Sequence, residues 1–389
     1  MKNAATPTAE TRLGRLQRYL QDDPHNGLLL ADAFDEALSS GAWDSAAQLA
    51  RLAEEEHLAQ PAWQFRRARL CIALRDLQRA AELLEALQGA LGDSPVLAHD
   101  LAYVRLLQGD FAACRALLQP WIDGEETPAD SDAALQVLWL RASHRLQRVD
   151  DALDWAQRRH AAGSLAPPAL GVASLVALDA SDFERAKHWS EASLRADRPV
   201  PEGLVTAAYV ALAEGHTEHA RGLLQRSLEL NRSDGRTWSV LGLASLQARD
   251  LPLAQKQLET AVQYMPAHIG TWHALGWARL LQGGRAQALE AFQHALALDR
   301  NFAESHGAVG MLLALDGQVA QAEHHLEAAD RLDANNLTAR YARALLAGTA
   351  GDAQAVQRLA LRLLDRPGFF GGKLSDSFTG LAGRPKSGA

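Results

Sequence analysis

Cysteine is almost absent from the 389-residue chain, which contains only Cys71 and Cys114. Two cysteines cannot form a disulfide framework, and we expect both to be buried thiols. Extended runs of β-branched and aromatic residues are also missing, which argues against strands. Alanine, leucine, glutamine and arginine dominate instead, and these residues favour helices. The absences therefore predict an all-helical fold.

Positive charge is in the minority, with a net charge of −8 and a pI near 6.0. Such a chain has no electrostatic reason to bind nucleic acid. The longest uncharged stretch, 161–178, is interrupted by Gly163, Pro167, Pro168 and Gly171. It therefore indicates a turn and a buried helix rather than a membrane span. The opening residues MKNAATPTAE lack the apolar centre of a signal peptide, so we expect a cytoplasmic protein.

Sequence patterns for catalysis or metal binding are missing too. The motifs H-E-x-x-H, C-x-x-C and G-x-S-x-G do not occur. The C-terminal GLAGRPKSGA is not a phosphate loop, because Lys386 does not directly follow a glycine of a G-x₄-G-K-[ST] frame. We therefore expect no enzyme, no catalytic residue, no cofactor and no metal. Six histidines cluster between 268 and 325, but the repeat frame below predicts that they point in different directions: His268, His273, His294, His306, His324 and His325.

What the sequence does contain is a repeat with a period of 34 residues. The segment GTWHALGWARLLQGGRAQALEAFQHALAL aligns with NFAESHGAVGMLLALDGQVAQAEHHLEAADRL one period later. A unit this short cannot bury an apolar face alone, so neighbouring units must stack. One insertion of four residues, between the third and fourth repeats, keeps the frame. The repeats begin at Gly27, Pro61, Pro95, Ala133, Pro167, Pro201, Gly235, Ile269, Ala303 and Leu337.

Three features of the repeat predict two helices, A and B, joined by a tight turn. Position 8 on helix A and position 20 on helix B are mostly small, as at Gly276 and Ala288, which predicts a close helix crossing. Position 15 is glycine in six repeats, as expected for a turn with positive φ. Position 24 carries large apolar residues such as Phe292, which fill the space between neighbouring repeats.

This pattern resembles the tetratricopeptide-repeat family over residues 27 to about 366. The family signature W-x₂-L-G occurs at 238–242 and 272–276, and Pro266 stands where the family often ends a repeat. The resemblance implies an all-α, right-handed superhelical solenoid of antiparallel helix pairs. Pentatricopeptide repeats, which bind RNA, have a period of 35. An RNA-binding solenoid is therefore the less favoured alternative.

The frame divides the chain into five parts. We expect the C-terminal tail to cover the last repeat, because a terminal repeat needs a polar outer face. Two alternatives are a homodimer through this end of the chain and a bound partner. The parts are a tail and capping half-repeat at 1–26, repeats one to three at 27–128, an acidic-loop insertion at 129–132, repeats four to ten at 133–366, and the C-terminal tail at 367–389.

The candidate binding face is the stripe of helix A at positions 2, 5, 9 and 12, opposite the packing residues. Its aromatic and apolar residues, with a few arginines, are typical of interface anchors. We therefore expect a scaffold or adaptor that binds a helical or extended segment of a partner protein in a concave groove. An alternative is an assembly chaperone or accessory factor of a bacterial secretion, pilus or polysaccharide-export machinery. The predicted groove residues are Phe65, Arg69, Tyr103, Arg141, Tyr209, Leu243, His273, Trp277 and Met311.

Overall fold

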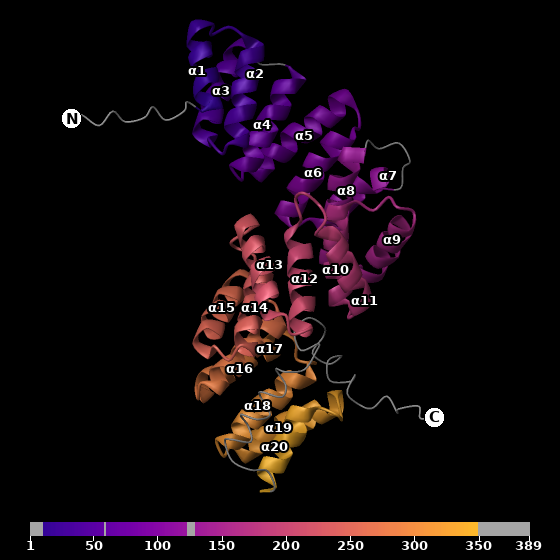
Figure 1. The fold of residues 1–389 in the computed structure, drawn as a ribbon, viewed down its shortest axis with the longest axis vertical. Helices are drawn as coiled ribbons and strands as arrows, with labels where there is room; N and C mark the ends of the chain where they lie inside the picture. The colour runs from indigo at the N-terminus through magenta and orange to yellow at the C-terminus, as the bar shows by residue number, and fades with distance from the viewer. Residues whose placement is uncertain (1–10, 58–59, 123–128, 349–389) are drawn as a thin grey trace, which may run out of the picture. The chain divides into compact units, whose positions relative to one another are not determined.

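The computed structural model describes residues 11–57, 60–122 and 129–348. Within these ranges the chain forms twenty helices and no strand, as the composition predicts. The chain divides into two compact units, residues 1–148 and 149–389. In each unit, every helix packs against the next helix along the chain (Figure 1). The structure therefore confirms an all-α fold built from adjacent helix pairs.

The N-terminal unit contains eight described helices. The first of them, α1, packs Leu13, Leu16 and Leu20 against the core of the first helix pair. The helices are α1 (Arg12–Asp22), α2 (Gly27–Ser39), α3 (Trp43–His57), α4 (Pro61–Ala73), α5 (Leu77–Leu91), α6 (Pro95–Gln108), α7 (Phe111–Ile122) and α8 (Ala129–Arg145).

The C-terminal unit contains twelve described helices, and its largest apolar cluster joins α14 to α20. The helices are α9 (Val149–Ala161), α10 (Pro167–Asp179), α11 (Phe183–Ser193), α12 (Pro201–Ala213), α13 (Thr217–Leu230), α14 (Gly235–Gln247), α15 (Leu251–Tyr264), α16 (Ile269–Leu281), α17 (Arg285–Leu298), α18 (Ala303–Leu315), α19 (Val319–Leu332) and α20 (Leu337–Leu346).

Local sequence signals determine where the helices begin. The even-numbered helices are the A helices, and nine of the ten start at the first residue of a repeat in the frame. Four of these start with proline, as at Pro61, because the first helical residue needs no amide donor. Others follow a side-chain cap such as Asn26 or Asp234, whose oxygen accepts a hydrogen bond from a first-turn amide.

The turn between helices A and B has the same backbone conformation in every described repeat. Position 15 has positive φ in all nine described turns, including Gly109 (φ 82°) and Gly283 (φ 85°). Glycine adopts this conformation without strain. The same position also holds Arg75 (φ 65°) and Arg249 (φ 63°), besides Gln147 and Ser181. The prediction of a positive-φ turn therefore extends to repeats that lack glycine.

The helix crossing explains the small residues at position 8. A Cβ atom added to Gly276 would lie 2.5 Å from Cε1 of Phe292, and one on Gly242 would lie 2.5 Å from Cγ of Leu258. Both contacts are far closer than van der Waals contact. Glycine at position 8 therefore lets the large residue at position 24 of helix B pack directly against helix A. The position-20 residues Ala254 and Ala288 are fully buried at the same crossing.

The four-residue insertion is helical rather than a loop. Helix α8 begins at Ala129, so residues 129–132 add about one turn before the start of the fourth repeat. An insertion of this length suits a helix, because one extra turn keeps the following side chains on nearly the same face. Residues 123–128, the part of the tenth repeat after residue 348 and the tail 367–389 lie outside the described residues.

The two cysteines are free thiols at packing positions. Cys114 is fully buried, and burial raises the pKa of its thiol to about 12. Cys71 is partly buried, and burial raises its pKa as well. A thiol with a raised pKa is a poor nucleophile at neutral pH, so both cysteines serve packing.

Candidate partner-binding face

In the N-terminal unit, the predicted face is accessible. Arg69 is exposed on α4, while Phe65 on the same helix, Tyr103 on α6 and Arg141 on α8 are each partly exposed. These residues occupy positions 5 and 9 of their repeats, which lie on one side of a helix. Aromatic side chains and arginines on a helix face are the usual anchors of protein interfaces.

The most exposed apolar residues of this face stand at position 2. Leu28 on α2 is 84% exposed and Val96 on α6 is 53% exposed. Both precede a residue at position 5 by three places, so they extend the same stripe. Position 2 belongs to the predicted stripe, but Leu28 and Val96 are not among the predicted groove residues. The sequence feature that marks both is an apolar residue in the first turn of helix A.

The charged groups of this face differ in how they are paired. Arg66 forms a bidentate pair with Asp35, with Nη2 2.8 Å from Oδ2 and Nε 3.1 Å from Oδ1. Its guanidinium also lies 5.3 Å from the ring centroid of Trp63. Arg69 forms no ion pair with any described residue. Arg69 therefore presents an unpaired cation on the face, one turn away from Phe65.

Tyr103 is held in place by its neighbour on the previous turn of α6. The rings of His99 and Tyr103 are stacked, with centroids 6.5 Å apart. His99 Nδ1 in turn lies 2.8 Å from a carboxylate oxygen of Asp100. An aromatic side chain whose orientation is already restrained loses little conformational entropy on binding.

In the C-terminal unit, the predicted face is part of the core. Five of the predicted groove residues are buried there, which corrects the expectation that they face a partner. Trp277 packs edge-on against Phe292 with ring centroids 5.2 Å apart, and Tyr209 stacks on Phe183 at 6.4 Å. The exposed fractions are 2% for Tyr209, 3% for Leu243 and 0% for His273, Trp277 and Met311.

Burial also determines the chemistry of His273. Its Nε2 atom lies 2.8 Å from the hydroxyl of Ser305, while Nδ1 has no hydrogen-bond partner among the described residues. Burial lowers the pKa of this histidine to about 3, so the ring is neutral at physiological pH. A neutral, buried histidine that contacts Phe292 and Phe302 is a packing residue.

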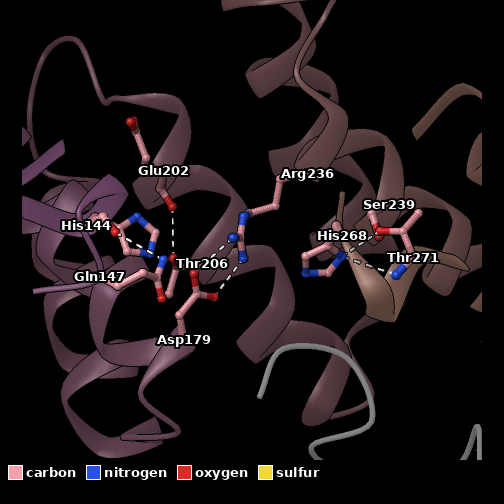
Figure 2. Close-up of polar contacts among 9 residues, drawn as sticks. All are labelled: His144, Gln147, Asp179, Glu202, Thr206, Arg236, Ser239, His268 and Thr271. Atoms are coloured by element: carbon pink, nitrogen blue, oxygen red, sulfur yellow. Dashed lines mark hydrogen bonds and ion pairs between the residues drawn. The ribbon is translucent and has the colours of Figure 1, made fainter. Parts of the chain in front are cut away.

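Polar contacts connect helices of the C-terminal unit that are not consecutive. Arg236 on α14 forms a bidentate pair with Asp179 at the end of α10, with N–O distances of 2.7 and 2.9 Å. Figure 2 shows the two side chains directed at each other. The pair joins helix A of one repeat to helix A of the repeat after next. The ion pair therefore links A helices that are two repeats apart within one unit.

His268 caps helix α16 next to this ion pair. Its Nδ1 accepts a hydrogen bond from the amide of Thr271 at 3.2 Å and lies 2.8 Å from the Thr271 hydroxyl, which is itself 2.9 Å from the hydroxyl of Ser239 (Figure 2). Burial and the nearby Arg236 lower the pKa of His268 to about 4, against the opposite effect of Asp179. A protonated Nδ1 cannot accept a hydrogen bond, so the cap requires the neutral ring.

A buried carboxyl group connects the last two described repeats. Glu304 on α18 is 2% exposed. It accepts hydrogen bonds from Nδ2 of Asn336 at 2.8 Å and from the hydroxyl of Thr338 at 2.6 Å. Burial raises the pKa of Glu304 to about 7, although these two hydrogen bonds lower it. The burial of Glu304 could not be predicted, because a single glutamate at position 2 of a helix is usually an exposed charge.

Two of the clustered histidines meet, contrary to the expectation that all six point in different directions. His306 on α18 and His325 on α19 bring their Nδ1 atoms to 3.0 Å. His294 instead stacks on Trp272 with centroids 4.5 Å apart. The described residues contain no group of three or more histidine, cysteine or acidic side chains placed to hold a metal ion. None of the described helices is long and apolar enough to cross a membrane.

Comparison with known proteins gives matches among solved structures only. No protein-family model and no curated protein matches the chain. The chain is similar to MamA of MSR-1, with 24% identity over 41% of this chain and 92% of that one, at a TM-score of 0.34. It is similar to YrrB, a TPR protein with an unusual peptide-binding site, with 17% identity over 46% and 92% at 0.36. It is also similar to the Cut9–Hcn1 hetero-tetramer of the APC/C, with 14% identity over 91% and 79% at 0.38.

The class of protein follows from the helix pairs themselves. Helices that alternate at fixed spacing, turn at positive φ and cross over small residues define an all-helical repeat protein. The helix starts recur every 34 residues, as between α14 and α16, and the tryptophan–leucine–glycine signature lies in those two helices. The described chain therefore has the architecture of a tetratricopeptide-repeat protein.

Proposed function

We propose that the chain is a non-enzymatic scaffold that binds a helical or extended segment of a partner protein on the A-helix face of its N-terminal unit. The observation that carries the proposal is the exposure of Leu28 and Val96 on the same stripe as the unpaired Arg69. Apolar side chains cost free energy in water, about 25 cal/mol for each Å² of apolar surface. A partner that covers them recovers this energy.

The chemistry of the face indicates what the partner segment must carry. Apolar side chains on the segment would pack on Leu28, Phe65 and Val96, and an acidic residue would pair with Arg69. A charge-assisted hydrogen bond to a guanidinium is stronger than a neutral one. Because position 2 and position 5 recur in each repeat, an extended segment or a helix can contact several repeats at once.

The experiment begins with the full-length chain as bait in its native cells, followed by identification of the bound protein and the segment that binds. The affinity of that segment is then measured by fluorescence anisotropy for three variants: Leu28→Asp, Val96→Asp and Arg69→Glu. We expect each variant to weaken binding at least tenfold, which corresponds to about 1.4 kcal/mol. Circular dichroism should be unchanged, because these side chains are exposed.

The matched control is Leu230→Asp. Leu230 is 57% exposed and lies on α13, a B helix of the C-terminal unit, so the substitution adds the same charge away from the face. This variant should bind like the parent chain. Equal affinity of the parent and all three face variants would reject the proposed face. Loss of binding in Leu230→Asp alone would instead place the binding surface on the B helices.

A further inference from the structure

His306 and His325 form a close pair in the C-terminal unit. His306 lies on α18 and His325 on α19, the two helices of one repeat. Their Nδ1 atoms are 3.0 Å apart and their ring centroids 5.3 Å apart. Both rings are partly buried, and they extend from a helix pair whose packing is fixed by Gly310 against Leu326.

The hydrogen bond on the far side of His306 determines its tautomer. Nε2 of His306 lies 3.0 Å from the backbone carbonyl oxygen of Arg300. A carbonyl oxygen only accepts, so Nε2 carries the proton and donates. The neutral ring therefore has its lone pair on Nδ1, which faces His325. Histidines that bind metals are held in this way, with the second ring nitrogen donating to a carbonyl or carboxylate.

We propose that His306 and His325 bind a divalent transition-metal ion, zinc or copper(II), through their two Nδ1 atoms. Zinc–nitrogen bonds of about 2.0–2.1 Å in a tetrahedral site place two ligand nitrogens roughly 3.3 Å apart. The observed separation of 3.0 Å is a few tenths of an ångström shorter, and both rings must also turn so that the two Nδ1 lone pairs meet at the ion. Imidazole nitrogens suit zinc and copper, whereas magnesium and calcium prefer oxygen ligands.

Metal binding changes the tautomer of His325. Without metal, Nδ1 of His325 donates its hydrogen to the lone pair of His306. The metal takes the lone pairs of both Nδ1 atoms, the hydrogen of His325 passes from Nδ1 to Nε2 by exchange with water so that the ring stays neutral, and water molecules complete the coordination. Since the ion joins α18 to α19 in the folded chain only, binding stabilises this repeat by mass action.

The test is calorimetric titration of the chelator-treated full-length protein with zinc chloride and, separately, copper(II) chloride. We expect about one equivalent of either metal to bind, with copper(II) tighter than zinc, as the general order of divalent metal affinity requires. His306→Gln and His325→Gln should each weaken this binding at least tenfold. Because the two substitutions lie on different helices, a shared loss cannot come from damage to one helix, and the melting temperature of each variant without metal checks its folding.

The matched control is His324→Gln, because His324 adjoins His325 in sequence and is exposed. It should retain the metal affinity of the parent chain, and zinc should raise the melting temperature of both proteins equally. Full metal binding in His306→Gln and in His325→Gln would overturn the proposal, as would loss of binding in the control alone. A parent chain that binds no metal at millimolar concentration would also overturn it.

Discussion

Position 9 of the repeat lies at the surface in one unit and in the core in the other. Arg69 and Tyr103 are accessible at this position in the N-terminal unit, while Trp277 and Met311 are fully buried at the same position in the C-terminal unit. Position 5 follows this division less strictly, because Phe65 is partly exposed and His273 is buried, but Val137 of the N-terminal unit is buried as well. One repeat frame can therefore place equivalent residues in opposite environments.

The A helices of the two units differ in composition in a way that explains this division. Helix α4 carries Arg66, Arg67 and Arg69 within four residues, whereas α18 carries Glu304 as its only charged residue apart from histidine. A helix that is apolar on all sides is stable only when all sides are covered. In the C-terminal unit most of α18 is buried, so the A helices that keep a polar and exposed side are those of the N-terminal unit.

Truncation of the side chain at position 9 in each unit should give the largest difference in stability. Trp277→Ala should lower the free energy of unfolding by about 3–5 kcal/mol, because it removes a fully buried aromatic ring and leaves a cavity beside Phe292. Tyr103→Ala, the matched change in the N-terminal unit, should cost less than about 1 kcal/mol. Urea unfolding followed by circular dichroism measures both. Equal costs would show that Trp277 is not a core residue.

The helix crossing gives a second contrast of somewhat smaller size. Gly276→Ala should destabilise the protein by about 1–3 kcal/mol, because the new Cβ would lie 2.5 Å from Phe292. Gly89→Ala on α5 of the N-terminal unit has no atom within 4 Å of its new Cβ, and should stabilise its helix by about 0.5–1 kcal/mol. Thermal melting of the two variants distinguishes them by sign. A stabilised Gly276→Ala variant would contradict the close crossing.

The histidine cap of α16 makes the C-terminal unit sensitive to acid. The pKa of His268 falls from 6.5 to about 4 on folding, so the unfolded chain binds more protons between these values and stability falls as pH decreases through that window. His268→Asn keeps a cap acceptor without the titration, and should remove about 1–2 kcal/mol of this loss. Urea unfolding at pH 7 and pH 4.5 measures it. The control His219→Asn changes an exposed histidine in the same unit and should keep the pH dependence of the parent chain. If His268→Asn loses as much stability between pH 7 and pH 4.5 as the parent chain, the His268 cap does not titrate in this range.

The turns give the smallest expected effect and apply to both units. Arg75 is exposed and has a φ of 65°, a conformation that costs a non-glycine residue about 1–2 kcal/mol. Arg75→Gly removes that cost but adds the backbone freedom of glycine to the unfolded chain, about 0.4–1 kcal/mol. The net gain should be about 0.5–1 kcal/mol by thermal melting. Arg75→Ala retains the strain and should show no gain; a gain of equal size in both variants would mean that the arginine side chain, and not the backbone, is unfavourable.

Much of the local architecture could be predicted because it depends on neighbours in sequence. A proline such as Pro61 or Pro95 starts a helix by its own covalent geometry. Gly109 indicates a turn because glycine, unlike other residues, adopts positive φ without strain. The recurrence of small residues at positions 8 and 20 predicts a close crossing of helices A and B. The frame also places turns at Arg75 and Arg249, but the residue type does not indicate their positive φ, because packing of the flanking helices overrides the preference of those side chains. The helical start of α8 could not be predicted either, because residues 129–132 have the acidic, polar composition that is typical of an exposed loop.

For the candidate site, too, local features could be predicted from the sequence and contacts between helices could not. The repeat period, the helix pairs and the stripe that carries Arg69 and Trp277 can be predicted from the amino-acid pattern, because they follow from side-chain spacing along one helix. Which of these two residues reaches solvent depends on packing between helices, and so do the pairing of Arg236 with Asp179 and the contact of His306 with His325. Burial and contacts between separate helices depend on how all the neighbouring surfaces pack, and the spacing of residues along one helix does not specify that packing.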